Sequence, residues 1–144
     1  MEKFMQIALK EAEKAYKLNE VPVGAIIVKN GKIIAKSHNI KEKKHDVTCH
    51  AEIVAIKKAC KKLKTWHLDE CEMYVTLEPC TMCCGAIEQS RIKKICYAAS
   101  SPLFGQIENN NKLFKQNKKI EIINKIHEKE SIELLQKFFK YKRK

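Results

Sequence analysis

Two short runs of sequence, thirty positions apart, constrain this chain more than any other feature. The first is His50-Ala51-Glu52 and the second is Pro79-Cys80-Thr81-Met82-Cys83. One imidazole and two thiolates suit Zn²⁺, and three protein ligands leave a fourth tetrahedral position open for water, as catalytic zinc sites do. The fold must therefore bring both runs to one point, where His50, Cys80 and Cys83 are the predicted ligands of one zinc ion per chain.

Glu52 is the acid of the first run, and the metal does not need it as a ligand. H-x-E combined with P-C-x-x-C is the signature of zinc nucleobase deaminases, in which the glutamate is a general acid and base. Zinc can lower the pKa of a water to about 7. Glu52 can then carry a proton to a ring nitrogen and later to the departing amino group. The predicted reaction is hydrolytic deamination of a base, with Glu52 catalytic and no organic cofactor.

A structural zinc site is the alternative interpretation of the same cysteines. Cys49 or Cys84 could supply a fourth ligand and close the coordination sphere. Neighbouring residues on a helix diverge by about 100°, so neither is expected to reach the metal that its neighbour binds. Both are predicted to be small buried residues instead.

Hydrophobic periodicity predicts alternating helices and strands. The expected helices cover residues 2–18, 81–90 and 131–141, with one more helix that starts near Thr48 or Cys49 and a short helical turn at 112–116. The expected strands cover residues 23–28, 32–36, 73–77, 92–97 and 120–123. Residues 38–49 are expected to form a polar loop. The strand-helix-strand unit after Met73 favours a parallel crossover. The sum predicts one α/β domain over residues 1–144, a three-layer α/β/α sandwich with a five-stranded mixed sheet.

Composition bounds the location and the partners. The N-terminus lacks a basic segment followed by an apolar export core, and no apolar run reaches the roughly 18 to 20 residues of a bilayer span, so we expect a cytoplasmic protein without a membrane partner. Its seven cysteines are then expected to stay reduced. The net charge is +12, of which residues 112–144 carry +7. A local basic surface favours a polyanion, although a lysine-rich surface that is only solvated would look the same.

The chain resembles the bacterial tRNA-specific adenosine deaminases of the cytidine-deaminase-like superfamily over about residues 4–97. The resemblance rests on these motifs: Glu20-Val21-Pro22-Val23-Gly24-Ala25, His45-Asp46 leading through Thr48 to His50-Ala51-Glu52-Ile53, Tyr74 to Cys83, Gly85-Ala86-Ile87 and Ser90-Arg91-Ile92. It implies a homodimer, zinc on the three ligands above and a contact from Asn39 to the target nucleoside. It further implies conversion of the wobble adenosine of a tRNA anticodon stem-loop to inosine, with the basic C-terminal helix (about 131–144) near the RNA. Lys140 and Arg143 of that helix are the predicted contacts.

One stretch departs from the family pattern. After the strand that ends at Tyr97, the family has a short acidic and glycine-rich segment, and here Ser101 stands where the aspartate is expected. A carboxylate can accept a hydrogen bond from a ribose 2′-hydroxyl, whereas serine is a weaker and neutral acceptor. Ser101 is therefore a predicted substrate contact, and we expect looser discrimination between RNA and DNA.

Two other functions compete with tRNA deamination. The zinc chemistry alone also fits a deaminase of free cytidine, deoxycytidylate or guanine, because pocket shape selects the base. The segment 137–144 favours a polymer, since it holds three aromatic and five cationic residues that can meet bases and phosphates. The rival from another class is a non-catalytic RNA-binding protein with a structural zinc, which would not require Glu52.

Overall fold

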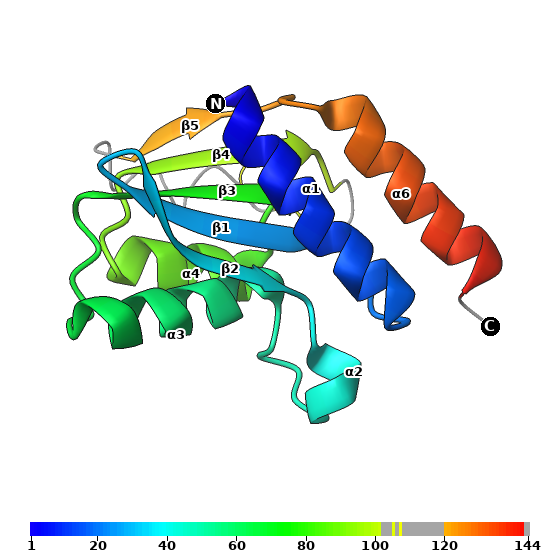
Figure 1. Cartoon of the computed structure of the whole chain (residues 1–144), viewed down its shortest axis with the longest axis horizontal. Helices are drawn as coiled ribbons and strands as arrows, with labels where there is room; N and C mark the ends of the chain where they lie inside the picture. The colour runs from blue at the N-terminus through cyan, green and yellow to red at the C-terminus, as the bar shows by residue number, and fades with distance from the viewer. Residues whose placement is uncertain (102–104, 106, 108–119, 143–144) are drawn as a thin grey trace.

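Five strands form one mixed sheet in the order β2-β1-β3-β4-β5 (Figure 1). The computed structural model describes residues 1–101, 105, 107 and 120–142. The strands are β1 (Gly24–Lys29), β2 (Lys32–His38), β3 (Cys71–Leu77), β4 (Lys94–Ala99) and β5 (Glu121–Ile123). β1 runs antiparallel to β2 and β3, whereas β4 runs parallel to β3 and β5. The predicted mixed sheet and its parallel crossover are confirmed.

Helices cover both faces of this sheet. Helices α1 (Glu2–Lys17) and α6 (Glu128–Tyr141) pack on one face, and α3 (Ala51–Leu63) and α4 (Thr81–Gln89) pack on the other (Figure 1). Successive side chains of a strand point to opposite faces; thus Ile26 of β1 packs with the α1 residues, whereas Ile27 packs with α3 and α4. The three-layer sandwich is confirmed. Among the described helices, none is long and apolar enough to cross a bilayer.

The stretch expected to be a polar loop contains a short helix, α2 (Lys41–Lys44). Its free N-terminal amides are satisfied by side chains from elsewhere. The Asn39 Oδ1 accepts from the amide of Lys41 at 3.0 Å, and the Glu20 carboxylate accepts from those of Glu42 and Lys43 at 2.9 and 2.8 Å. Periodicity could not predict α2, because a carboxylate more than twenty residues away stabilises it.

Other boundaries differ slightly from the prediction. Helix α3 begins at Ala51, later than expected, because His50 is an extended N-cap residue with φ −68° and ψ 154°. Helix α6 begins at Glu128, three residues before the predicted start. The predicted turn at 112–116 lies outside the described residues.

Lysine side chains lie along β2, the outer strand of the sheet. Lys32 and Lys36 are exposed along this strand. The Lys58 ammonium of α3 reaches over the edge and donates to the backbone oxygen of Lys36 at 2.8 Å. One main-chain acceptor at the edge is therefore already occupied.

Gly24 lets α1 lie directly against β1. A Cβ built on Gly24 would stand 2.0 Å from the backbone oxygen of Ala8 and 2.6 Å from the backbone nitrogen of Ala12. The Gly24 amide also donates to Thr76 Oγ1 at 3.1 Å, which links β1 to β3. This position therefore has no room for any side chain.

We predict that Gly24→Ala lowers the free energy of unfolding by about 3 kcal/mol, since backbone rather than a flexible side chain must move. Urea denaturation measures this change. Gly85→Ala is the matched control, because a Cβ on Gly85 meets nothing within 4 Å, and a helical Gly→Ala change stabilises by roughly 0.5 to 1 kcal/mol. Equal unfolding midpoints for wild type and Gly24→Ala would contradict the close approach of α1.

Candidate metal centre

The structure brings the three predicted metal ligands together. The His50 Nδ1 lies 3.7 Å from the Cys80 sulfur and 3.6 Å from the Cys83 sulfur, and the three ligand atoms all lie within 4.8 Å of one another. His50 is half-buried and Cys83 is fully buried. This group could hold a metal ion.

Two helix starts create the group. His50 is the N-cap residue of α3, Cys80 is the N-cap residue of α4, and Cys83 lies in the first turn of α4. Pro79 disfavours helical backbone at Glu78, the residue before it. Cys80 is extended, with φ −78° and ψ 177°, so α4 begins only at Thr81. The free amides and positive dipole ends of both helices favour negative charge on the thiols.

The two thiols differ strongly in acidity. Hydrogen bonding with Cys83 and with His50 lowers the pKa of Cys80 to about 4. The same contact with Cys80, together with burial, raises the pKa of Cys83. The hydrogen bond with Cys80 also raises the pKa of His50. These contacts favour the thiolate form of Cys80.

Glu52 lies beside this group without being part of it. It is the second residue of α3 and only 4 % exposed. Burial raises the pKa of its carboxyl to about 7, and the carboxyl contacts the Cys83 thiol. A carboxyl with such a pKa can both take up and release a proton near neutral pH.

The other cysteines near the site are engaged elsewhere. The Cys84 thiol donates to the Pro79 backbone oxygen at 3.6 Å, and the Cys49 thiol bonds to the Asp46 carboxylate. Burial raises the pKa of both thiols. Among the described residues, neither sulfur belongs to the metal-binding group, as expected of small buried residues.

Asn39 is buried at the base of α2. Its Nδ2 donates to the Val21 backbone oxygen at 3.4 Å, while its Oδ1 accepts from the Lys41 amide. The next residue, Ile40, donates its amide to the Cys49 backbone oxygen at 3.1 Å, so Asn39 is held near the residue that precedes His50. Its contact with a nucleoside stays a prediction.

Ser101 is held close to the start of α4 by a buried carboxylate. The Glu78 Oε1 accepts from the Ser101 amide at 3.0 Å, and the Ser101 backbone oxygen accepts from the Gly105 amide at 2.8 Å. A Cβ on Gly105 would stand 2.1 Å from the Glu78 carboxylate.

Glu78 and Glu20 are not among the predicted site residues, although their carboxylates hold segments beside the metal centre. Each is an acid one or two residues before a proline. This position was the available sequence signal for a buried acid that holds backbone amides.

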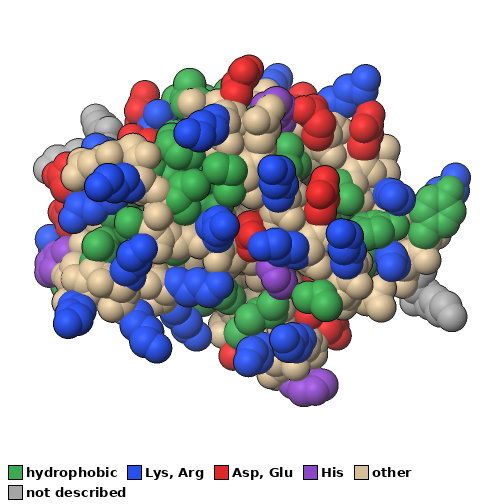
Figure 2. All heavy atoms as spheres, in the orientation of Figure 1, with side chains coloured by type: hydrophobic (Ala, Val, Ile, Leu, Met, Phe, Trp, Pro, Cys, Tyr) green, Lys and Arg blue, Asp and Glu red, His purple; other side chains and the backbone are tan. Residues whose placement is uncertain are grey.

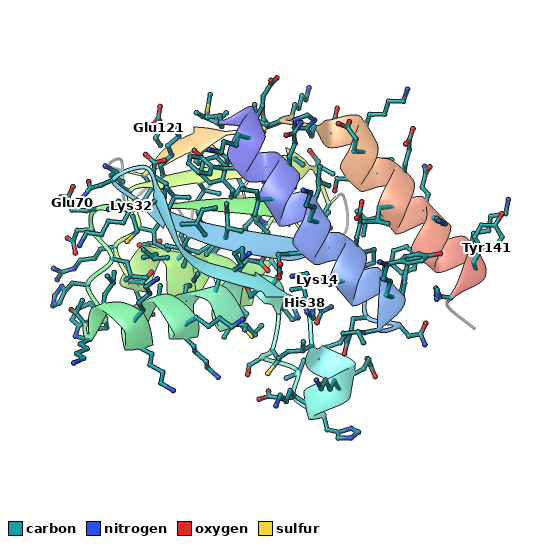
Figure 3. All side chains as sticks on the ribbon, in the orientation of Figure 1. Lys14, Lys32, His38, Glu70, Glu121 and Tyr141 are labelled. Atoms are coloured by element: carbon teal, nitrogen blue, oxygen red, sulfur yellow. The ribbon has the colours of Figure 1, made fainter. Side chains whose placement is uncertain are left out.

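Lys140, one of the two predicted tail contacts, lies on α6, on the other face of the sheet. Phe138 docks α6 against the Tyr16 ring, with centroids 6.4 Å apart. Lys140 is exposed, and its ammonium lies 5.3 Å from the centre of the Tyr141 ring, which projects from the end of α6 (Figure 3). Among the described parts of the chain, Lys140 is not brought to the metal centre, and Arg143 lies outside the described residues.

Comparison with known proteins gives one consistent family. A sequence model of the MafB19-like deaminases matches residues 1–143. The tRNA-specific adenosine deaminase of Agrobacterium fabrum is 42 % identical over 143 residues, which cover 97 % of this chain and 94 % of that protein. A solved structure from a study of A-to-I editing by tRNA:A34 deaminases has a TM-score of 0.88 and 41 % identity, and the match covers 92 % of this chain and 99 % of that one.

A guanine deaminase structure from Bacillus subtilis matches over a shorter part. It is 44 % identical with a TM-score of 0.66, and the match covers 69 % of this chain and 64 % of that one. The relatives named for tRNA match almost the whole chain at 41 to 42 % identity, whereas a guanine deaminase structure from Nitrosomonas europaea covers 95 % of this chain at only 23 % identity. The tRNA:A34 deaminase structure confirms the cytidine-deaminase-like fold. The chain therefore belongs to the MafB19-like deaminase family and groups there with the tRNA-specific adenosine deaminases.

Proposed function

We propose that this chain is a zinc-dependent tRNA adenosine deaminase that converts the wobble adenosine of an anticodon to inosine. One observation carries the proposal: a His-Cys-Cys group stands beside a buried, unligated glutamate. Curated relatives that are 41 to 45 % identical over at least 94 % of this chain are named tRNA-specific adenosine deaminases, and one solved relative comes from a study of editing at the wobble position. The substrate is thus the anticodon stem-loop of a tRNA.

The donor set and its spacing support zinc as the metal. Tetrahedral zinc with Zn–N of about 2.0 to 2.1 Å and Zn–S of about 2.3 Å separates a nitrogen ligand from a sulfur ligand by about 3.6 Å. The separations from His50 Nδ1 to the sulfurs of Cys80 and Cys83 are 3.7 and 3.6 Å. These residues would hold the ion. When bound, it supplies a Lewis acid that lowers the pKa of a water from 15.7 to about 7.

Glu52 moves the protons of the reaction. Its carboxylate takes a proton from the water and delivers it to a ring nitrogen of adenine, so that the amino-bearing carbon becomes electrophilic enough for oxygen to add. Glu52 then takes the proton of the newly added hydroxyl and transfers it to the amino group, which leaves as ammonia while the carbonyl of inosine forms. Adenosine and water are thereby converted to inosine and ammonia. The pKa near 7 that burial gives Glu52 suits a group that must act as base and then as acid.

The remaining predicted contacts form the RNA-binding part of the proposal. Asn39 contacts the target nucleoside, and Ser101 contacts the ribose of the same region. Lys140 and Arg143 meet phosphates through the C-terminal helix. The support is placement: Asn39 and Ser101 are fixed by hydrogen bonds beside the two helix starts, while Lys140 is exposed.

We further propose a homodimer that acts in the cytoplasm. The homodimer is what the family resemblance implies, and the mass of the protein in solution checks it.

The decisive test is to incubate the zinc-loaded protein with total tRNA and to look for inosine at the first anticodon position. Free cytidine and free guanine run in parallel. Inosine in tRNA with both small substrates unchanged is the expected result, whereas turnover of guanine alone would favour the free-base alternative.

In the same assay, Glu52→Gln keeps the shape of the side chain but cannot carry a proton. We predict a loss of turnover of about 10³-fold, within the range of general acid–base catalysis, with one zinc per chain retained and tRNA affinity unchanged. Full activity of this variant would show that another group moves the protons. A non-catalytic zinc protein would make no inosine with either residue.

Ser101 is tested by restoring the acid. We predict that Ser101→Asp increases the preference for an RNA hairpin over its DNA analogue about fivefold, because a charged acceptor strengthens a hydrogen bond by roughly 1 kcal/mol. Relative turnover of the two hairpins is the measurement. Ser100→Asp adds the same charge one residue earlier and should leave the ratio unchanged. Equally strict RNA preference in wild type and Ser101→Asp would refute this role.

The tail is better tested by one substitution than by deletion, because Phe138 is part of the packed structure. We predict that Lys140→Gln weakens tRNA binding and reduces the slope of log Kd against log salt by about 1, as loss of one phosphate contact does. Lys32→Gln is the control, since Lys32 is exposed at the far end of the molecule from Tyr141 (Figure 3). An unchanged slope for Lys140→Gln would remove this residue from the RNA contact.

A further inference from the structure

An aromatic and cationic cluster lies at the end of α3 that is far from the metal centre. Trp66 and His67 stack with centroids 3.8 Å apart and planes at 26°. The Arg91 guanidinium lies 5.2 Å from the centre of the Trp66 ring and donates to His67 Nδ1 at 3.3 Å. We refer to Trp66, His67 and Arg91 as the Trp66 platform.

Packing does not explain why this platform exists. Trp66 is 54 % exposed, so the stack leaves most of the largest aromatic side chain in water. Arg91 is also held at φ +67°, in the left-handed region that is costly for a residue with a side chain. A planar guanidinium on an exposed indole is the arrangement on which a nucleobase can stack.

A row of lysines connects the platform to the metal centre. Lys57 and Lys61 are exposed one turn apart on α3, where like charges repel, and the exposed Lys64 is the C-cap residue that follows them. We name them the α3 ridge. No acidic residue occurs from 53 to 68, and Figure 2 shows Lys and Arg side chains gathered over the region of α3. Helix α3 has 13 residues and is therefore about 20 Å long.

Two carboxylates border the platform and limit its positive charge. Asp69 lies 3.8 Å from His67 Nδ1, and Glu70 lies 3.9 Å from the Lys93 ammonium. Both acids are already next to a basic group, whereas the α3 ridge has no acid along its own helix beyond Glu52. The charge therefore matches a polyanion that runs along α3.

We propose that the Trp66 platform stacks an unpaired base of an RNA, and that the α3 ridge follows the RNA backbone between the platform and the metal centre. The proposal rests on the proposed function in taking tRNA as that RNA. The platform then binds nucleotides well outside the target base, about one helix length away. It adds affinity for a large RNA and takes no part in the chemistry.

The emission of Trp66 tests this directly, because it is the only tryptophan of the chain. Titration of the zinc-loaded protein with total tRNA should quench the emission to saturation. Heparin is a polyanion without bases, so it should compete for binding without the same quenching. Unchanged emission at saturating tRNA, or equal quenching by heparin, would overturn the proposal.

Variants give an independent measurement. Trp66→Ala should raise the Kd for tRNA about fivefold to a hundredfold, the range of one base-aromatic stack, whereas Trp66→Phe should keep most of the affinity. Arg91→Gln should raise Kd as well, and Arg91→Lys should restore the salt dependence but not the full affinity. Lys3→Gln, which removes an exposed lysine from α1, is the control. Wild-type Kd for both Trp66→Ala and Arg91→Gln would reject the platform.

Inosine formation separates this proposal from the proposed function. In Trp66→Ala, kcat should match wild type while KM for tRNA rises. If wild type makes inosine but its tryptophan emission does not respond to tRNA, the platform is wrong and the function stands. If emission responds but no tRNA acquires inosine, the platform stands and the reaction is wrong.

Discussion

The meeting of two helix N-termini is the constraint on which the rest of the structure depends. His50 ends an extended segment before α3, and Cys80 ends another before α4. The ligands thus come from positions where the backbone changes direction, while the bodies of α3 and α4 pack on one face of the sheet. Their separation is therefore set by how the two helices pack on the sheet.

Two buried carboxylates hold the segments around the metal group in place. Glu20 fixes α2 through two backbone amides, and Glu78 fixes the Ser101 turn through one. Each carboxylate satisfies donors that would otherwise be unpaired. The segments that border the metal group are therefore held by specific hydrogen bonds, although they contain little regular structure.

The sequence predicted the sandwich, the sheet and the grouping of the three ligands, because these follow from periodicity and from the chemistry of His50, Cys80 and Cys83. It could not predict α2 or the Trp66 platform. α2 depends on Glu20, and the platform joins Trp66 to Arg91, which is distant in sequence. Such long-range contacts leave no periodic trace. Local patterns also misplaced the start of α3, since the N-cap residue His50 is extended.

The lysines at the edge of β2 affect how copies of this chain behave at high concentration. A bare outer strand is a template on which other chains can add strands and grow into cross-β aggregates. Here Lys58 occupies the carbonyl of Lys36, and the cationic side chains along the strand repel an incoming copy. The lysine-rich composition therefore also protects the fold against self-templated aggregation, independently of any nucleic acid.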